Sequence, residues 1–396
     1  MNGFRALLLS VLLLILGSSL LQAQTPDHNS VKQEGNINSE VKKLIQNFKK
    51  KNPKVVGLTM VTVDGVDASK KPQVARYFYG YANQSAKTPI DANTVFEIGS
   101  VTKTFVSAAL ALYAQQDAKF DINDEVQPYY DQHYPGEVKL PVYTDAEGNT
   151  FEMTFADLVS MHSGFDTERP YIPAKQRFKY TVADFFAYLS DTVLVNKPGT
   201  ASAEFYSNTN YAILALILQK MMDAPDMAVL KQKVVHGLEI PLNHTGSVLD
   251  LKEYLKVKRS FAVGYDEEGD PAPLNLSDFP AMGGAGCLFS DQQDMMVWLL
   301  YNMQMLPMKE SNQELMQNIQ TPLPSSDPKS NWAMGWSFEG SGNDRVYQKD
   351  GGMYGFYALL TFNVEEQKGV MILSNTACKN CQQELGTAVL NKLLGK

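Results

Sequence analysis

Strand-like segments lie at the two ends of this 396-residue chain, and this distribution constrains the fold more than any other feature of the sequence. Runs rich in β-branched and aromatic residues, which are typical of strands, occupy positions 55–63, 74–81, 332–338, 345–348, 356–364 and 369–374. Short helical patterns, turns and loops fill positions 121–260. We therefore expect a mixed α/β (α+β) fold, in which both chain ends build one antiparallel sheet with helices on its faces. The middle would form a second, mostly helical lobe.

The same distribution predicts the domain organisation. Residues 37–125 together with 262–396 would form the sheet domain, and residues 126–261 would form the helical lobe. A cleft between two such lobes is a natural place for a substrate. The loops at 126–180 and 240–280 would then determine which substrate is accepted.

The first residues are interpreted as a targeting segment. Arg5 precedes an apolar run, and a small-residue site ends at Ala23, which is typical of a cleaved secretory signal over residues 1–23. A retained membrane anchor is the alternative, because the run is about as short as a spanning helix can be. Residues 24–36 are polar and are expected to form a flexible leader. We expect an exported protein, periplasmic or secreted, with no stable membrane span after signal cleavage.

Charge and cysteine content exclude several functions. The formal net charge is −8 and the basic residues are scattered, so no nucleic-acid partner is expected. Cys378 and Cys381 would form a disulfide in an oxidising compartment or remain thiols, and Cys287 would be free and buried. A zinc site would need further ligands, and no histidine lies near the pair. The sequence therefore indicates neither a metal nor a cofactor.

Three motifs in a fixed order indicate an activated nucleophile. The first is Ser100 followed by Lys103, placed after Gly99 at the start of an apolar helix. Residues three apart share a helical face, so the lysine reaches the serine hydroxyl. Burial would lower the pKa of Lys103 and make it a general base. The helix N-terminus would also favour negative charge that develops beside Ser100.

The same spacing occurs in two other places, Ser39–Lys42 and Ser326–Lys329. Ser39 is interpreted as the N-cap of a helix over residues 40–51. Ser326 lies in a Pro/Ser-rich loop with no helix to align the pair. Only Ser100 has the surroundings of a nucleophile.

The second motif is Tyr206-Ser-Asn208, just before a helical run at 211–222. Held near two lysines, the Tyr206 hydroxyl would carry phenolate character and pass a proton to a leaving group. Asn208 would offer its amide to a substrate carbonyl. A turn with a single aromatic anchor is the alternative. Tyr81–Asn83 repeats the spacing, but it lies at the end of a predicted strand and before any candidate nucleophile.

The third motif is Lys349-Asp350-Gly351-Gly352, on a strand-like segment. Free backbone N–H groups at such a strand edge would face the substrate, and those of Ser100 and Gly352 would together form an oxyanion hole. His244-Thr-Gly246 is the main competitor for this motif. It follows a helix-and-turn segment and has no strand pattern after it.

With these motifs in place, the chain resembles the class C β-lactamase and penicillin-binding-protein-like serine hydrolases. The matching segments are 96–105, 198–211 and 282–290, and the resemblance covers most of residues 40–396. It implies a β-lactamase/transpeptidase-like fold and a serine acyl-enzyme mechanism. The roles it implies are a nucleophile, a proton-transfer pair, a positive charge and substrate contacts. The residues are, in that order, Ser100; Lys103 and Tyr206; Lys349; and Asn208, Asp350, Gly351 and Gly352.

Two departures from the family pattern matter. His162 stands one position later than the histidine that the family often carries, so we assign it no catalytic role and expect a structural one. Asp350 stands where β-lactamases carry a threonine or serine that binds a substrate carboxylate. If Asp350 faces the substrate, repulsion would disfavour an anionic substrate by about 1–4 kcal/mol, and Lys349 would partly offset this cost.

The sequence thus predicts an exported serine hydrolase that cleaves an ester or amide (peptide) bond through an acyl-enzyme on Ser100. Its substrate would be a small molecule or a peptide. A β-lactamase or D-Ala-D-Ala carboxypeptidase is the close alternative. An alternative of another class is a penicillin-type acyl-binding or sensory module without turnover.

Overall fold

The computed structural model describes residues 31–35, 38–166, 180–200, 206–272, 280–325 and 330–396. The predicted signal segment, 1–23, and the loop pair Ser326–Lys329 lie outside the described residues. Among the residues that are described, no helix combines the length and the apolar character needed to cross a membrane.

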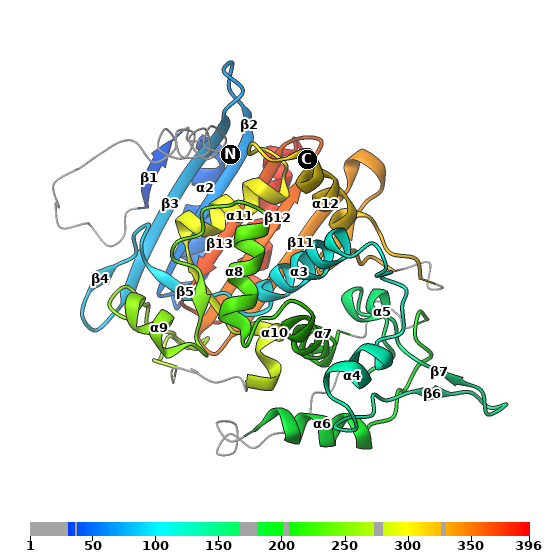
Figure 1. The fold of residues 1–396 in the computed structure, drawn as a ribbon. Helices are drawn as coiled ribbons and strands as arrows, with labels where there is room; N and C mark the ends of the chain where they lie inside the picture. Colours follow the sequence, from blue (N-terminus) through cyan, green and yellow to red (C-terminus); the bar gives the residue numbers. More distant parts are fainter. Residues whose placement is uncertain (1–30, 36–37, 167–179, 201–205, 273–279, 326–329) are drawn as a thin grey trace.

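One large antiparallel sheet takes its strands from both ends of the chain (Figure 1). The strand order is β1-β3-β2-β13-β12-β11-β10, and β4 pairs with β3. In the centre β2 pairs with β13, with Leu58 opposite Ser374, so the first and last parts of the chain close the sheet together. The strands are β1 (Lys32–Gly35), β2 (Gly57–Val66), β3 (Pro72–Asn83), β4 (Thr88–Pro89), β10 (Ser337–Glu339), β11 (Val346–Met353), β12 (Phe356–Asn363) and β13 (Lys368–Ser374). The predicted fold class is confirmed.

Two terminal helices, α2 (Ser39–Lys51) and α13 (Lys379–Leu393), cover one face of the sheet. α2 buries Val41, Ile45 and Phe48, whose spacing places them on one helical face. They share a hydrophobic cluster with alternate residues of the central strands, namely Met60, Tyr77, Leu359 and Ile372. Because side chains alternate along a strand, the residues between these point to the opposite face.

The opposite face carries the larger core. In Figure 1, α3 (Thr102–Gln116), α8 (Met227–Gly237) and α11 (Gln292–Asn302) lie in front of the sheet. The first eleven residues of α3 are all buried, so this helix is enclosed on every side. Phe105 of α3 stacks on Trp298 of α11 with ring centroids 4.2 Å apart. This packing fixes α3 and the turn that precedes it.

The middle of the chain is mostly helical, as predicted, and its strands are two residues long. A single hydrophobic cluster runs from these helices into α3, α11 and the sheet. The division at residues 126 and 261 therefore remains a prediction, and the core is continuous across it. Besides α8, the elements here are α4 (Gln127–His133), α5 (Phe155–Val159), α6 (Val182–Asp191), α7 (Asn208–Met221), α9 (Leu251–Val257), β6 (Tyr143–Thr144), β7 (Thr150–Phe151) and β8 (Gly246–Ser247).

Shorter elements connect these layers. β5 (Val95–Glu97), β9 (Leu288–Asp291) and β8 form a second, three-stranded sheet, and β6 pairs with β7. The other helices and 3-10 turns of the described residues are η1 (Gly99–Val101), η3 (Pro280–Met282), α10 (Gly283–Gly286), α12 (Glu310–Gln320) and η4 (Gly342–Asp344).

The flexible leader predicted over residues 24–36 is wrong for four of its residues. Lys32–Gly35 form β1, which pairs with β3 and places Lys32 opposite Phe78. β1 lies at the edge of the sheet, and its side chains are exposed or half-buried. A polar edge strand of this kind lacks the apolar alternation from which strands are predicted.

Two predicted boundaries also change. Asn38 rather than Ser39 caps α2, because its side-chain oxygen accepts the N–H of Glu40 at 3.0 Å. In the segment predicted as a strand over 332–338, β10 begins only at residue 337. Gly335 has a φ of +78°, a conformation that glycine adopts readily. The N–H of Ala333 donates to the carbonyl of Trp336 at 2.9 Å, which closes a turn there.

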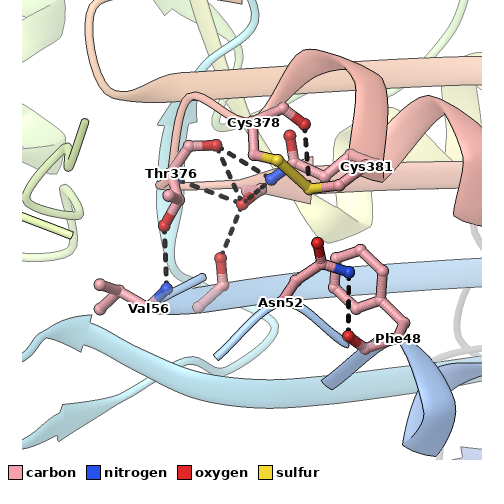
Figure 2. The surroundings of a disulfide bond; sticks show 9 residues. Phe48, Asn52, Val56, Thr376, Cys378 and Cys381 are labelled. Atoms are coloured by element: carbon pink, nitrogen blue, oxygen red, sulfur yellow. Dashed lines mark hydrogen bonds between the residues drawn. A yellow bond between two sulfur atoms is a disulfide. The ribbon is translucent and has the colours of Figure 1, made fainter. Parts of the chain in front are cut away.

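Cys378 and Cys381 form a disulfide at the start of α13 (Figure 2). Cys287 is a free, buried thiol. The backbone just before the disulfide is tied to the sheet, because the Thr376 hydroxyl accepts the N–H of Val56 at 2.9 Å. The disulfide reading of this pair is confirmed, and the first turn of α13 is anchored beside the end of β13.

Candidate active site

Ser100 lies in the 3-10 turn η1, immediately before α3, rather than in the α-helix itself. Two glycines let strand β11 lie directly against this turn. Gly99 has a φ of +48°, and a Cβ on Gly351 would stand 2.1 Å from the carbonyl oxygen of Ile98 and 2.7 Å from the nitrogen of Ser100. Any larger residue at position 351 would therefore push the strand away from the serine.

Lys103 is fully buried, and its Nζ has three oxygen partners. It lies 2.9 Å from Ser100 Oγ, 2.8 Å from Asn208 Oδ1 and 2.7 Å from the carbonyl oxygen of Ala285. An ammonium has three protons for these three acceptors. A neutral amine has two, which would stay with Asn208 and Ala285, so that its lone pair would face the Ser100 hydroxyl.

The surroundings of Lys103 favour that neutral form more than water does. Burial lowers the pKa of Lys103 to about 8, the charge of Tyr206 opposes this, and the positive charge of Lys349 lowers it further. Since the ordinary pKa of a lysine is about 10.4, a larger fraction of Lys103 is neutral near pH 8 than of an exposed lysine. This is the direction a general base requires.

Tyr206 lies between the two lysines. Its ring centroid is 5.0 Å from Lys103 Nζ and 4.8 Å from Lys349 Nζ. Lys349 Nζ donates to the Tyr206 hydroxyl oxygen at 3.3 Å. Trp332 packs on the tyrosine with ring centroids 6.0 Å apart. The Tyr206 hydroxyl and ring therefore lie directly beside both lysine side chains.

Lys349 is also buried, and burial lowers its pKa to about 8, while Asp350 opposes this shift. It comes from β11, Tyr206 from the segment before α7, and Lys103 from α3. The fold thus brings together three side chains, at positions 103, 206 and 349, that are far apart in the sequence. Hydrogen bonds join Lys103 to Ser100 and Asn208, and Lys349 to Tyr206, and the Tyr206 ring lies between the two groups.

The backbone of β11 near Gly352 leaves N–H groups for a ligand. β10 pairs with Val346, Tyr347 and Gln348, and in the described part of the chain no strand pairs with the edge beyond them. Met353 and Phe356 flank a two-residue hairpin and pair across it, so the next pair, Gly352 with Tyr357, is the non-hydrogen-bonded kind. The N–H of Gly352 therefore points to the open edge, where the predicted oxyanion hole would lie.

Asp350 lies in an electrostatic setting that the sequence did not reveal. Its carboxylate pairs with Lys379 Nζ at 3.3 Å and lies 3.9 Å from Lys349 Nζ. Burial alone would raise the pKa of the Asp350 carboxyl, but the two lysines outweigh it and hold the pKa below its usual value. Lys379 is the residue after Cys378, in the first turn of α13. The charge of Asp350 is therefore compensated, which weakens the expected repulsion of an anionic substrate.

The Ala285 carbonyl, which accepts a hydrogen bond from Lys103, belongs to α10, and Gly284 allows α10 to lie close to α7. A Cβ on Gly284 would stand 2.2 Å from the carbonyl oxygen of Tyr211 and 2.3 Å from the Cβ of Ala215. Both contacts are far closer than atoms tolerate, so a larger residue would separate the two helices and move the Ala285 carbonyl away from Lys103.

We therefore expect Gly284→Ala to lower both stability and activity. Overpacking of this kind costs about 1–3 kcal/mol of the free energy of unfolding, which denaturant titration would measure. Gly286→Ala is the matched control, because a Cβ there meets nothing closer than 3.5 Å. Equal loss of stability in the two variants would show that the approach of α10 to α7 does not depend on Gly284.

His244, in the competing motif, belongs to a helix cap. Its Nδ1 bonds the buried Asp291 carboxylate at 2.5 Å, and the N–H groups of His244 and Thr245 both donate to Asp294 at 2.7 Å. With Asp291 and Asp294, His244 makes up a group whose ligand atoms lie within 4.8 Å of one another. Because the carboxylates already bond the histidine, the backbone and the start of α11, we assign the group a structural role.

The other decoys also lie apart from the cluster. Ser39 begins α2, on the sheet face opposite α3, and Tyr81–Asn83 are the last residues of β3. His162 is buried and hydrogen-bonds Ser160 and Ser330, which agrees with the predicted structural role. A cavity of about 860 Å³ lies elsewhere, between the ends of α3 and α7 and helix α8, and contains none of the predicted site residues.

Three groups that contribute to the site were not predicted from the sequence. They are the Ala285 carbonyl, the ring of Trp332 and the Lys379 ammonium. The glycine segment 282–290 was recognised only as a family resemblance, and no local pattern relates a backbone carbonyl to a distant lysine. Lys379 was visible as part of the Cys378–Cys381 turn, but its partner lies 29 residues earlier, at Asp350.

Comparison with known proteins places the chain in a family. The sequence profile of the beta-lactamase family matches residues 44–390. A beta-lactamase of Providencia stuartii is 26% identical over 337 residues, which cover 76% of this chain and 79% of that protein. Protein flp of Staphylococcus aureus (strain N315) is 23% identical over 305 residues, 75% of this chain but only 56% of flp.

Solved structures agree in fold. The octameric penicillin-binding protein homologue from Pyrococcus abyssi aligns with a TM-score of 0.70 at 21% identity, covering 90% of this chain and 77% of that chain. A class C beta lactamase from Rhodobacter sphaeroides aligns with a TM-score of 0.68 at 19% identity, covering 91% of this chain and all (100%) of that one. With a family profile matched over most of its length, this chain belongs to the beta-lactamase family.

Proposed function

We propose that this protein is an exported serine hydrolase that cleaves an ester or amide bond through an acyl-enzyme on Ser100. The single observation that carries the proposal is the contact of Lys103 Nζ with Ser100 Oγ at 2.9 Å, made by a lysine that is fully buried. A nucleophile beside a base whose pKa is lowered is the arrangement that acyl transfer needs. Export is proposed from the apolar segment that follows Arg5.

Acylation would proceed as follows. Neutral Lys103 takes the proton of the Ser100 hydroxyl, and Oγ attacks the carbonyl carbon of the substrate. The carbonyl oxygen becomes an oxyanion that accepts hydrogen bonds from the N–H groups of Ser100 and Gly352. Tyr206 gives its hydroxyl proton to the leaving oxygen or nitrogen as the bond to the carbonyl carbon breaks. The transient phenolate is stabilised by Lys349, and the proton on Lys103 replaces the one that Tyr206 gave up.

Deacylation reverses these roles. A water molecule attacks the ester carbonyl of acylated Ser100 and gives its proton to the tyrosine–lysine pair. The oxyanion of the second tetrahedral intermediate accepts hydrogen bonds from the same two N–H groups. When it collapses, the bond from Ser100 Oγ to the acyl carbon breaks, and Oγ regains a proton from Lys103. The side-chain oxygen of Asn208 accepts a hydrogen bond from Lys103. Its amide N–H₂ group would then donate to a carbonyl of the substrate.

The charges around Asp350 bear on the substrate class. Lys349 and Lys379 together offset its carboxylate, so we propose neutral esters and amides as the first substrates and keep anionic ones, including penicillins, as the second class. An anion near this strand would meet two positive charges and one negative charge, which adds up to a modest attraction in a partly screened site. The β-lactamase or D-Ala-D-Ala carboxypeptidase reading is thereby stronger than the sequence alone made it.

The pH profile tests the role of Lys103. Only the neutral amine accepts a proton, so kcat/KM for a neutral nitrophenyl ester is expected to rise with pH and to level off above the pKa of about 8. The two buried lysines are close enough to titrate together, so the apparent pKa belongs to the pair. Rates from pH 6 to 10, corrected for spontaneous hydrolysis, give the curve.

Lys349→Met sharpens this test. Removing a positive charge beside Lys103 raises the pKa of Lys103, because that charge lowers it in the native protein. The rising limb is therefore expected to move to higher pH, along with a loss of rate. A limb that stays in place or moves to lower pH would contradict Lys103 as the group whose deprotonation limits the reaction.

The proposed function is tested against the acyl-binding alternative by counting turnovers. Purified protein and an excess of nitrophenyl ester should release many equivalents of nitrophenol per protein molecule at a constant rate. A sensory module without turnover would release about one equivalent and stop, because its acyl-serine is not hydrolysed. A burst of one equivalent followed by a slow steady rate would identify deacylation as the limiting step of a hydrolase.

A further inference from the structure

We propose that His162 is a positioning residue for Tyr206, acting through Ser330 and Trp332. The sequence assigned His162 no part in catalysis, and the acyl-enzyme mechanism above does not use it. The inference rests on the proposed function in one respect, namely that Tyr206 transfers a proton. Its basis is an unbroken series of contacts from the buried imidazole to the tyrosine ring.

The imidazole is held at both nitrogens. Nδ1 lies 2.8 Å from Ser160 Oγ, and Nε2 lies 2.9 Å from Ser330 Oγ. The Ser160 hydroxyl already donates its proton to the carbonyl of Ala156 at 2.6 Å. Ser160 can therefore only accept, which assigns the Nδ1 proton to His162. In the neutral ring Nε2 is then an acceptor, and the hydroxyl of Ser330 donates to it.

Ser330 leads directly to the ring that packs on Tyr206. Two residues later, Trp332 is 8% exposed and lies 6.0 Å from the Tyr206 ring, centroid to centroid, at an interplanar angle of 41°. The turn at Gly335 closes the other end of this segment, because the Gly335 N–H donates to the carbonyl of Val159 at 3.3 Å. The segment that presents Trp332 is thus attached at both ends to residues 159–162.

The same residues also contact positions before and after Tyr206 in the chain. The Gly199 N–H donates to the carbonyl of His162 at 2.9 Å. Ser163 donates to Asn210 Oδ1 at 2.7 Å, in the first turn of α7. Residues 159–163 therefore contact the segment that carries Trp332 and positions on both sides of Tyr206, the two rings whose contact the proposal concerns.

Backbone strain marks this turn. Met161, immediately before His162, is buried and has a φ of 66°. The left-handed region is unfavourable for a non-glycine residue, so the surrounding contacts must hold Met161 there. Strain of this kind is common where a precise side-chain position matters for function. Here the strained residue directly precedes the imidazole that bonds Ser160 and Ser330.

The test is a set of kinetic measurements on the purified protein with a neutral nitrophenyl ester. Ser330→Ala removes the hydroxyl that His162 holds, and we expect kcat to fall about tenfold with KM within about twofold, since small misplacements of a reacting group are costly in rate. Ser330→Thr keeps the hydroxyl and should restore kcat to within about threefold of the native value. His162→Gln should lower kcat at least as far as Ser330→Ala.

Thr192→Val is the matched control. Like Ser330→Ala, it deletes a half-buried hydroxyl that donates a hydrogen bond, here to the backbone carbonyl of Tyr188 at 2.6 Å, and it should leave kcat unchanged. Thermal melting of each variant checks that it is folded. If His162→Gln does not fold, the serine variants still decide the question.

Repeating Ser330→Ala in a Tyr206→Phe background separates positioning from a general structural effect. With the tyrosine hydroxyl gone, Ser330→Ala should change kcat by less than about twofold, because the two effects share one route. A tenfold loss in both backgrounds, or no loss in the native background, would overturn the inference and leave the proposed function intact. If Tyr206→Phe alone keeps full activity, the proton route of the proposed function is wrong and the inference falls with it.

Discussion

Replacing Ser100 with alanine is expected to lower kcat for ester hydrolysis by about 10⁴-fold or more, because loss of the nucleophile of a serine hydrolase removes the acyl-enzyme route altogether. The purified variant should remain folded, since Ser100 lies in a 3-10 turn between packed elements and its hydroxyl has one partner among the described contacts, Lys103. Initial rates with a nitrophenyl ester measure the loss.

The chain supplies its own control. Ser39 and Lys42 have the same spacing as Ser100 and Lys103, but they belong to α2, on the other face of the sheet. Ser39→Ala should therefore leave kcat unchanged. Comparable activity in Ser100→Ala and the native protein would refute the nucleophile assignment, and a loss in Ser39→Ala would point to a contaminating or unrelated activity.

Lys103→Met is expected to lower kcat by about 10³-fold, within the range that a positioned general base contributes. Methionine keeps most of the apolar stem of lysine in a site that is fully buried, so the fold should persist. It cannot accept the Ser100 proton, and it leaves Asn208 Oδ1 and the Ala285 carbonyl without their donor. Circular dichroism and thermal melting would confirm that the variant is folded before its rate is measured.

Lys103→Arg tests whether charge alone is enough. Arginine retains a positive charge but is not deprotonated in proteins, so it cannot act as a base and should be nearly as inactive as methionine. Full activity of the arginine variant would mean that Lys103 acts only as a cation. Another group, with Tyr206 the nearest candidate, would then have to take the serine proton.

Much of the architecture follows from the sequence because its signals are local. The strands β2, β3, β12 and β13 are marked by β-branched and aromatic runs, and α3 is marked by a long apolar stretch without glycine or proline. The sequence also distinguishes Ser100 from Ser39, because the helix after Ser100 is apolar and the helix after Ser39 is rich in lysine. β1 was not predicted, because a polar edge strand is defined by its pairing with β3 and not by a pattern in its own residues.

The electrostatics of the site could not be read in the same way. From the sequence, Asp350 was expected to be a negative charge that Lys349, its cationic neighbour in the chain, only partly offsets. The fold brings Lys379 to 3.3 Å from it, through the turn that the Cys378–Cys381 disulfide closes. The Ala285 carbonyl reaches Lys103 only because Gly284 lets α10 approach α7. Such long-range pairings depend on packing, which single-residue patterns do not encode.

The most direct test of the central claim is active-site labelling with an alkyl fluorophosphonate, followed by intact mass and peptide mass spectrometry. An activated serine attacks phosphorus, fluoride leaves, and the tetrahedral adduct resembles the intermediate of acyl transfer. We predict one adduct per molecule on the peptide that contains Ser100, loss of esterase activity in proportion to labelling, and no adduct on Ser100→Ala. Persistent activity without labelling, or inactivation by an adduct on another residue, would contradict Ser100 as the nucleophile.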